Sequence, residues 1–147
     1  MIVKYPNLKL SEPCLEIPQA DIGKAVSKLL IRTIHQRDGA CGFAANQVKM
    51  NEKIFTALVD NKWKVFINPI IFSKSAATFL STESCLSIPG KEYHVLRHEA
   101  IVLKYIDKNG KKQTDGFKGF NAVVIQHEVD HLNGITIADI GNLKGGN

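Results

Sequence analysis

Two histidines four residues apart are the first feature of the sequence that points to chemistry. His127 and His131 enclose Glu128 in the pattern H-E-x-x-H. On a helix, residues four apart lie one turn above each other, so both imidazole rings can bind the same metal ion. Glu128 follows the first ring directly and can act as a base toward a water at that metal. The pattern therefore predicts a hydrolytic metal site on a helix.

A simpler interpretation is a solvated helix that carries two surface histidines. In a chain of this composition the H-E-x-x-H pattern arises by chance in roughly 1% of shuffled sequences. The residues around the pattern are apolar, namely Val123, Val124, Ile125 and Leu132. Such a helix is at least half buried, and buried histidines need partners. We therefore favour the metal site.

A catalytic metal site uses three protein ligands and leaves one position open. After His131 the chain offers neither a histidine nor a glutamate, and Ile137 stands where one class of metalloproteases has its final histidine. The third ligand is then Asp139 or an upstream residue, and the upstream candidates are Cys14, His35, Cys41, Cys85, His94 and His98. We favour Cys85, because it precedes a rigid Pro-Gly bend and a thiolate binds metals strongly. Taken alone, Cys85 is typical of a small buried apolar residue.

The composition is that of an ordinary folded domain. The 147 residues are 44% hydrophobic and 22% charged, so we expect a single catalytic domain over residues 1–147. No apolar run approaches the ~18–20 residues of a membrane span, and the first residues lack the blocks of a signal peptide. We therefore expect a cytoplasmic protein with no membrane partner. Three cysteines, a small and odd number, indicate free thiols.

The net charge of +5 permits contact with an anionic surface but does not require it. The densest basic cluster consists of Lys108, Lys111 and Lys112 and is typical of a solvated hairpin tip. Charge without interleaved aromatic residues gives only weak support to a nucleic-acid-binding module. We therefore expect no stable binding to nucleic acid.

The elements that must position these residues follow from hydrophobic spacing. Apolar residues recur at helical intervals over about Asp21–Arg37, which predicts one N-terminal helix. Strand-like segments flank turn signals at Asn61-Lys62 and Asn109-Gly110, which favours antiparallel or mixed sheets. A second helix carries the metal motif and ends at Gly134, before a flexible tail over about residues 138–147. The expected fold class is α+β, with antiparallel or mixed β-sheets packed around a central metal-binding helix.

Three short motifs resemble those of the peptide deformylases. They stand in the order and at the spacing of that family, as ACGFAANQ (Ala40–Gln47), ESCLS (Glu83–Ser87) and QHEVDH (Gln126–His131). The usual family patterns are G-x-G-L-A-A-x-Q, E-G-C-L-S and Q-H-E-x-D-H. The chain departs from them at Ala40, Phe43 and Ser84. Because glycine serves where backbone and ligand approach closely, the two lost glycines are expected to narrow the groove or shift substrate preference.

The resemblance implies an enzyme that hydrolyses the N-formyl group of formyl-methionyl peptides and releases formate. The implied ligands of one divalent metal are Cys85, His127 and His131, with Glu128 as the base. The Gln47 side chain and the Leu86 backbone N–H are the implied donors to the oxyanion. Family members generally use Fe²⁺, and a site of one cysteine and two histidines also suits Zn²⁺, Ni²⁺ or Co²⁺.

The resemblance also implies how the substrate binds. The peptide is expected to add as a strand beside Gly42 and Ser84 through main-chain hydrogen bonds. The methionine side chain is expected in an apolar pocket lined by Cys41, Phe120, Val123 and Val124. Ordinary core packing is the alternative for these walls.

Two acidic residues, Glu83 and Asp130, are expected to orient the metal ligands or to form structural ion pairs, with Arg97 as a partner of Glu83. The chain ends soon after the metal helix and so resembles short family members that lack the C-terminal helix. We expect a monomer with at most a transient ribosome contact. Two other functions stay open, namely a metallopeptidase or amidase of other specificity, and a catalytically inactive binding domain.

Overall fold

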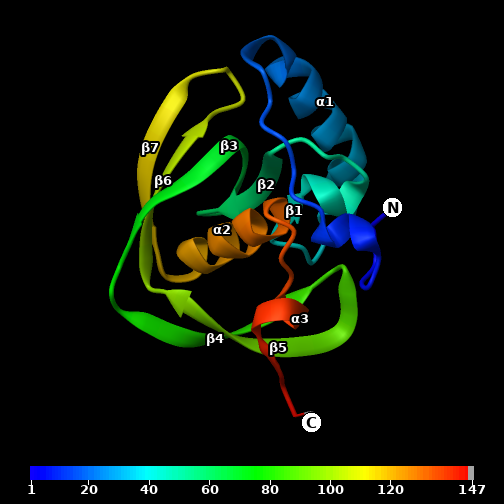
Figure 1. The fold of residues 1–147 in the computed structure, drawn as a ribbon. Helices are drawn as coiled ribbons and strands as arrows, with labels where there is room; N and C mark the ends of the chain where they lie inside the picture. The colour runs from blue at the N-terminus through cyan, green and yellow to red at the C-terminus, as the bar shows by residue number, and fades with distance from the viewer. Residues whose placement is uncertain (146–147) are drawn as a thin grey trace.

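The computed structural model describes residues 1–145, in which two antiparallel sheets enclose one central helix (Figure 1). The larger sheet has the strand order β1-β2-β3-β6-β7 and the smaller one the order β4-β5-β8. The larger sheet consists of β1 (Gly42–Ala44), β2 (Ile54–Val59), β3 (Lys62–Lys74), β6 (Ala100–Ile106) and β7 (Lys112–Lys118). The smaller sheet consists of β4 (Thr78–Cys85), β5 (Ile88–His98) and β8 (Asn142–Leu143). The helices are α1 (Ile22–Thr33), α2 (Gly119–Leu132) and α3 (Ile137–Ile140).

The central helix is α2, drawn in orange in Figure 1 with β6 and β7 on one side and β4 and β5 below it. Nine of its 14 residues are buried, so it is covered on more than one face. The main core lies between α2, α1 and the larger sheet, where Phe55 and Phe66 stack with their ring centroids 4.6 Å apart. The predicted α+β fold around a central helix is thereby confirmed.

The end of α2 depends on one glycine. Gly134 has a φ of +77°, and its N–H donates to the carbonyl of His131 over 2.9 Å. This is the left-handed termination that the sequence predicted. A Cβ at this position would lie 2.5 Å from the carbonyl oxygen of Ser11, so the N-terminal segment packs directly against the helix end.

The first helix and the two hairpins are present as predicted, but they begin or end at slightly different residues. The helix predicted over Asp21–Arg37 is α1, which gives way to a 3-10 turn at Ile34–Gln36. The β2–β3 turn consists of Asp60 and Asn61, both with positive φ, one residue earlier than predicted. The β6–β7 loop holds Gly110 at a φ of +82°.

The C-terminal segment differs from the predicted flexible tail over residues 138–145. There α3 is capped by Asp139, whose carboxylate accepts hydrogen bonds from the N–H and hydroxyl of Thr136. Leu143 pairs with Tyr93 as part of β8, an arrangement set by distant β5 that local composition does not reveal. Residues 146 and 147, also in the predicted tail, lie outside the described residues. Within residues 1–145, no helix combines the length and apolar character needed to cross a membrane.

Candidate metal centre and groove

Three metal-binding side chains converge between the smaller sheet and α2. Cys85 ends β4, and His127 and His131 stand one turn apart on α2. Their ligand atoms all lie within 4.8 Å of one another, and Cys85 Sγ is 3.4 Å from His131 Nε2. In the part of the chain that the structure describes, no other three such residues meet in this way. The other candidates from the sequence, which lie outside this cluster, are Cys14, His35, Cys41, His94, His98 and Asp139.

Glu128 lies in the same space with one carboxylate oxygen free. It is 4% exposed, and its Oε1 has no hydrogen-bond partner within residues 1–145. Burial raises the pKa of Glu128 to about 7, which suits a group that takes and returns a proton near neutral pH. A Cβ on Gly42 would lie 2.6 Å from Glu128 Oε2, so the carboxylate fits only because β1 carries a glycine there.

A buried ionic network orients His127. Its Nδ1 is 2.9 Å from Glu83 Oε1, while Arg97 donates to both oxygens of Glu83 over 2.7 and 2.8 Å. Arg97 also donates to Asp130 over 2.6 Å. Burial by itself would raise the pKa of Glu83, but hydrogen bonds from Arg97 and His127 lower it to about 2. The predicted pairing of Arg97 with Glu83 is confirmed. Because Glu83 engages Nδ1 of His127, the Nε2 atom of that ring is left to face the other two ligands.

The two rings differ electrostatically. Burial lowers the pKa of His131 well below its usual value, so this ring is neutral and ready to bind a metal. Burial also favours a neutral His127, but its contacts with Cys85 and Glu83 raise the pKa of His127 to about 10. A metal ion that binds this ring therefore displaces a proton. One soft sulfur and two imidazoles, with an orphaned carboxylate beside them, are a donor set that fits a divalent transition metal.

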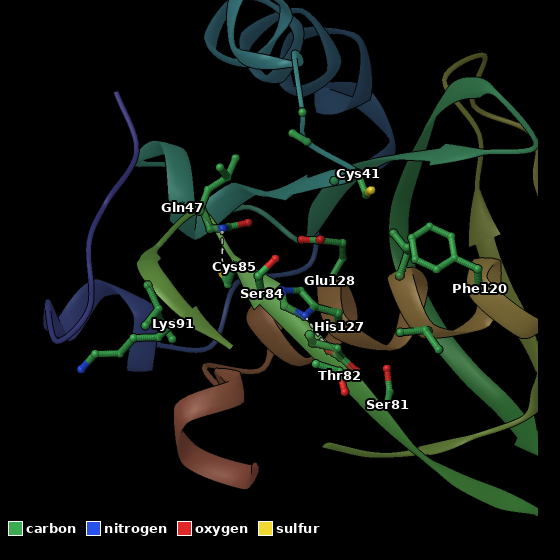
Figure 2. A pocket seen from close by; sticks show the side chains of 18 of the residues that line it. Cys41, Gln47, Ser81, Thr82, Ser84, Cys85, Lys91, Phe120, His127 and Glu128 are labelled. Carbon is green, nitrogen blue, oxygen red and sulfur yellow. Dashed lines mark hydrogen bonds and ion pairs between the residues drawn. The ribbon is translucent and has the colours of Figure 1, made fainter. Parts of the chain in front are cut away.

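Gln47 is fixed at the edge of this cluster rather than at the surface. It is 2% exposed, and its Oε1 accepts a hydrogen bond from the N–H of Ala44 over 2.9 Å. Its Nε2 donates to Ser87 Oγ over 3.1 Å. The same nitrogen approaches Cys85 Sγ at 3.6 Å, and Figure 2 marks this contact with a dashed line. Leu86 is the first of the two turn residues that follow Cys85. The Gln47 amide and the Leu86 peptide therefore flank the sulfur.

The N-terminal segment holds these two parts together, which the sequence reasoning missed. The N–H of Val3 donates to the carbonyl of Gln47, and that of Tyr5 donates to the carbonyl of Ser87, over 2.7 and 2.8 Å. Lys4 Nζ donates to the carbonyl of Leu86 over 3.0 Å. The only local signal is an extended, proline-containing start, which does not say where that segment pairs.

A pocket of about 760 Å³ opens over the cluster, between β1 and β4. Both strands are edges of their sheets, so their outer backbone groups face the groove. All six predicted substrate-binding residues line it, namely Cys41, Gly42, Ser84, Phe120, Val123 and Val124. Cys41, Ser84 and Phe120 are labelled in Figure 2. Residues that the sequence did not suggest also line it, among them Lys4, Phe79, Ser81, Thr82 and Lys91.

The sequence model of the family described as polypeptide deformylase matches residues 1–144. The chain belongs to the peptide deformylase family. A peptide deformylase of Karelsulcia muelleri is 35% identical over 145 residues, which cover 94% of this chain and 76% of that protein.

Solved deformylase structures have the same fold. The peptide deformylase of Thermotoga maritima superposes with a TM-score of 0.86 at 28% identity and covers 95% of each chain. The enzyme of the Vibrio parahaemolyticus bacteriophage VP16T, determined in complex with actinonin, gives a TM-score of 0.85 at 33% identity. That match covers 92% of this chain and 98% of the phage chain. This deformylase is thus a metal-dependent hydrolase of N-formylated peptides with a site for a divalent metal.

Proposed function

We propose that this deformylase removes the N-formyl group from formyl-methionyl peptides of newly made proteins, with Cys85, His127 and His131 as its metal ligands. The observation that carries the proposal is the meeting of these three ligand atoms within 4.8 Å, beside a buried carboxylate and beneath an open groove. A divalent metal held there would supply Lewis acidity, which lowers the pKa of a water and polarises the formyl carbonyl.

Glu128 is the base in this mechanism. Its pKa of about 7 lets it accept a proton from the attacking water and then donate it to the leaving amine. Gly42 leaves room for this carboxylate at the groove, and within residues 1–145 no hydrogen bond engages its Oε1.

Gln47 and Leu86 stabilise the oxygen that becomes negative as water attacks the formyl carbon. The Gln47 amide is already oriented by Ala44 and Ser87, so it loses little freedom when it donates to the oxyanion. The Leu86 N–H is offered by the turn that follows Cys85. The loss of one such donor typically costs ~3 kcal/mol of transition-state stabilisation.

The peptide lies as an added strand between the two sheet edges, beside Gly42 and Ser84. Main-chain hydrogen bonds to both edges would tolerate varied sequence beyond the first residue. The first side chain enters the apolar end of the pocket, whose walls are Cys41, Phe120, Val123 and Val124. Phe120 is 66% exposed and forms the lip of this end.

The finer assignments belong to the same proposal. We infer that residues 1–147 act as one catalytic domain and as a monomer in the cytoplasm, where newly made formylated peptides occur. Fe²⁺ is the expected native metal, and Zn²⁺, Ni²⁺ or Co²⁺ would fit the same donors. Any ribosome contact would be transient, and no stable partner among nucleic acids or membranes is expected.

Formate release tests the proposal. Protein purified without oxygen and loaded with Fe²⁺ is given formyl-Met-Ala-Ser and its acetylated twin, and formate and acetate are measured. Formate alone should be released. Glu128→Gln should lower the rate by at least ~10²-fold with metal retained, while the exposed Glu99→Gln serves as the matched control. Cleavage of the acetylated or unformylated peptide would favour a metallopeptidase or amidase, and full metal occupancy without release would favour an inactive binding domain.

A further inference from the structure

One wall of the groove carries a hydroxyl group, that of the largely buried Ser81. Ser81 faces the same side of β4 as Glu83 and Cys85, because alternate residues of a strand share a face. These three residues are 7%, 7% and 8% exposed. Ser81 lines the pocket together with Phe120, and Figure 2 shows both on the same side of His127.

Ser81 lies where the end of the first side chain is expected. Glu83 contacts His127 over 2.9 Å, so it shows which part of β4 lies beside the metal ligands. Ser81 precedes Glu83 by two residues, about 6.6 Å along the strand. Val123, another wall of the pocket, precedes His127 by four residues, about 6 Å along the helix. Both displacements are comparable with the length of an extended methionine side chain.

Within residues 1–145 no protein group forms a hydrogen bond with the Ser81 hydroxyl, and its oxygen does not belong to the fully buried unpaired polar atoms, so it is accessible from the pocket. Its cross-strand neighbour on β5 is Val95, and the walls Val123 and Val124 are apolar. A hydroxyl that is open to a pocket is hydrated in the free protein, so a ligand that displaces this water must replace its hydrogen bond or leave the hydroxyl unpaired. A hydroxyl that borders a ligand pocket can be satisfied by the ligand, and such isolated polar groups fix ligand specificity.

We propose that Ser81 selects the first side chain of the formylated peptide by donating a hydrogen bond to an acceptor atom at its end. This inference rests on the deformylase function proposed above. The thioether sulfur of methionine is a weak acceptor, and the oxygen of methionine sulfoxide is a much more polar one. An apolar pocket would leave the sulfoxide oxygen unpaired. The enzyme should therefore deformylate peptides that begin with formyl-methionine sulfoxide, and it should prefer methionine to its apolar isostere norleucine.

Three tripeptides test Ser81 directly, namely formyl-Met-Ala-Ser and its norleucine and methionine sulfoxide counterparts. Formate release gives kcat/KM for each with the Fe²⁺-loaded wild type, Ser81→Ala and Ser81→Thr. In Ser81→Ala the ratio of kcat/KM for the sulfoxide peptide to kcat/KM for the norleucine peptide should fall about tenfold. The corresponding ratio of the methionine peptide to the norleucine peptide should fall about twofold. Ser81→Thr keeps a hydroxyl and should restore much of the sulfoxide ratio.

The exposed Ser73 on β3 supplies the matched control, because Ser73→Ala should leave both ratios unchanged. If the ratio for the sulfoxide peptide is the same in wild type and Ser81→Ala, the role proposed for Ser81 is wrong, while the deformylase function proposed above still stands. If the wild type released no formate from the methionine peptide, the deformylase proposal itself would fail. Because each ratio is measured within one variant, a difference in folded fraction between variants cancels.

Discussion

At the scale of single residues, the position of Glu128 depends on the missing side chain of Gly42. A Cβ there would lie 2.6 Å from Oε2 and 2.9 Å from Cδ of Glu128, so Gly42→Ala must displace the carboxylate. A displacement of about 1 Å in a catalytic group typically costs ~10²-fold in rate. We expect formate release by Gly42→Ala to fall by that order, with metal content unchanged.

The control for this change is Gly116→Ala on β7. Its Cβ would come no closer than 3.9 Å to any atom, the carbonyl oxygen of Ile101. Its activity should match the wild type. Wild-type activity in Gly42→Ala would show that Glu128 is not confined as the structure indicates.

Arg97 is the second residue whose loss has a clear consequence. It is 4% exposed and neutralises Glu83, which is also buried. Arg97→Ala removes the guanidinium from a buried ion pair and leaves Glu83 with His127 alone, so it should lower the free energy of unfolding by about 3–5 kcal/mol. Urea denaturation measures this, and the same variant should bind metal ~10–100-fold more weakly because His127 loses its orientation.

The matched comparison is Lys28→Ala, which removes the more exposed ion pair with Glu52. Exposed pairs contribute about 0–1 kcal/mol, so this variant should unfold near the wild-type urea concentration. Equal losses in the two variants would contradict the role given to the buried network.

At the scale of elements, the end of α2 is fixed against the N-terminal segment through Gly134. Gly134→Ala incurs both the strain of its positive φ and a clash with the carbonyl oxygen of Ser11 at 2.5 Å. Gly39→Ala has a similar φ of +74° but meets nothing within 4 Å. The left-handed conformation alone costs roughly 1–2 kcal/mol, so Gly134→Ala should destabilise by clearly more than Gly39→Ala in thermal unfolding.

The elements also show which parts of the structure can be predicted from the sequence. The pairing of His127 with His131 is a matter of helical spacing. Cys85 was favoured from its place before a Pro-Gly bend and its thiolate chemistry, whereas Gln47 was suggested only by the family motif. The contacts of Val3, Lys4 and Tyr5 with the site, and the pairing of β8 with β5, join residues more than 40 positions apart. No local pattern specifies such pairings, so they became visible only in the fold.

Ser81 illustrates the same limit within the site. The sequence marks it only as one polar residue in a strand, while its burial and its place on the pocket wall come from the packing of β4 against α2. The family motif begins two residues later, at Glu83, and so gave no signal for Ser81.

At the scale of the whole molecule, Cys14 should make the free energy of unfolding decrease at alkaline pH. Burial raises the pKa of Cys14 from 9.0 to about 11. Between these values the unfolded chain loses a proton that the folded chain keeps, so the free energy of unfolding falls as pH rises from about 9. The fall due to Cys14 should approach roughly 2 kcal/mol by pH 11.

Urea denaturation of wild type and Cys14→Ala across pH 8–11 isolates this contribution, because other groups titrate equally in both proteins. The difference in unfolding free energy between them should shrink as pH rises. A difference that is constant across the range would contradict a buried neutral thiol at Cys14.

The most direct test of the whole account is X-ray absorption at the metal edge of active, metal-loaded protein. The account predicts one sulfur and two imidazole nitrogens bound to the metal, with the sulfur contribution lost in Cys85→Ser and retained in Cys41→Ser. A metal shell without sulfur in the active enzyme, or a sulfur contribution that survives in Cys85→Ser, would contradict it.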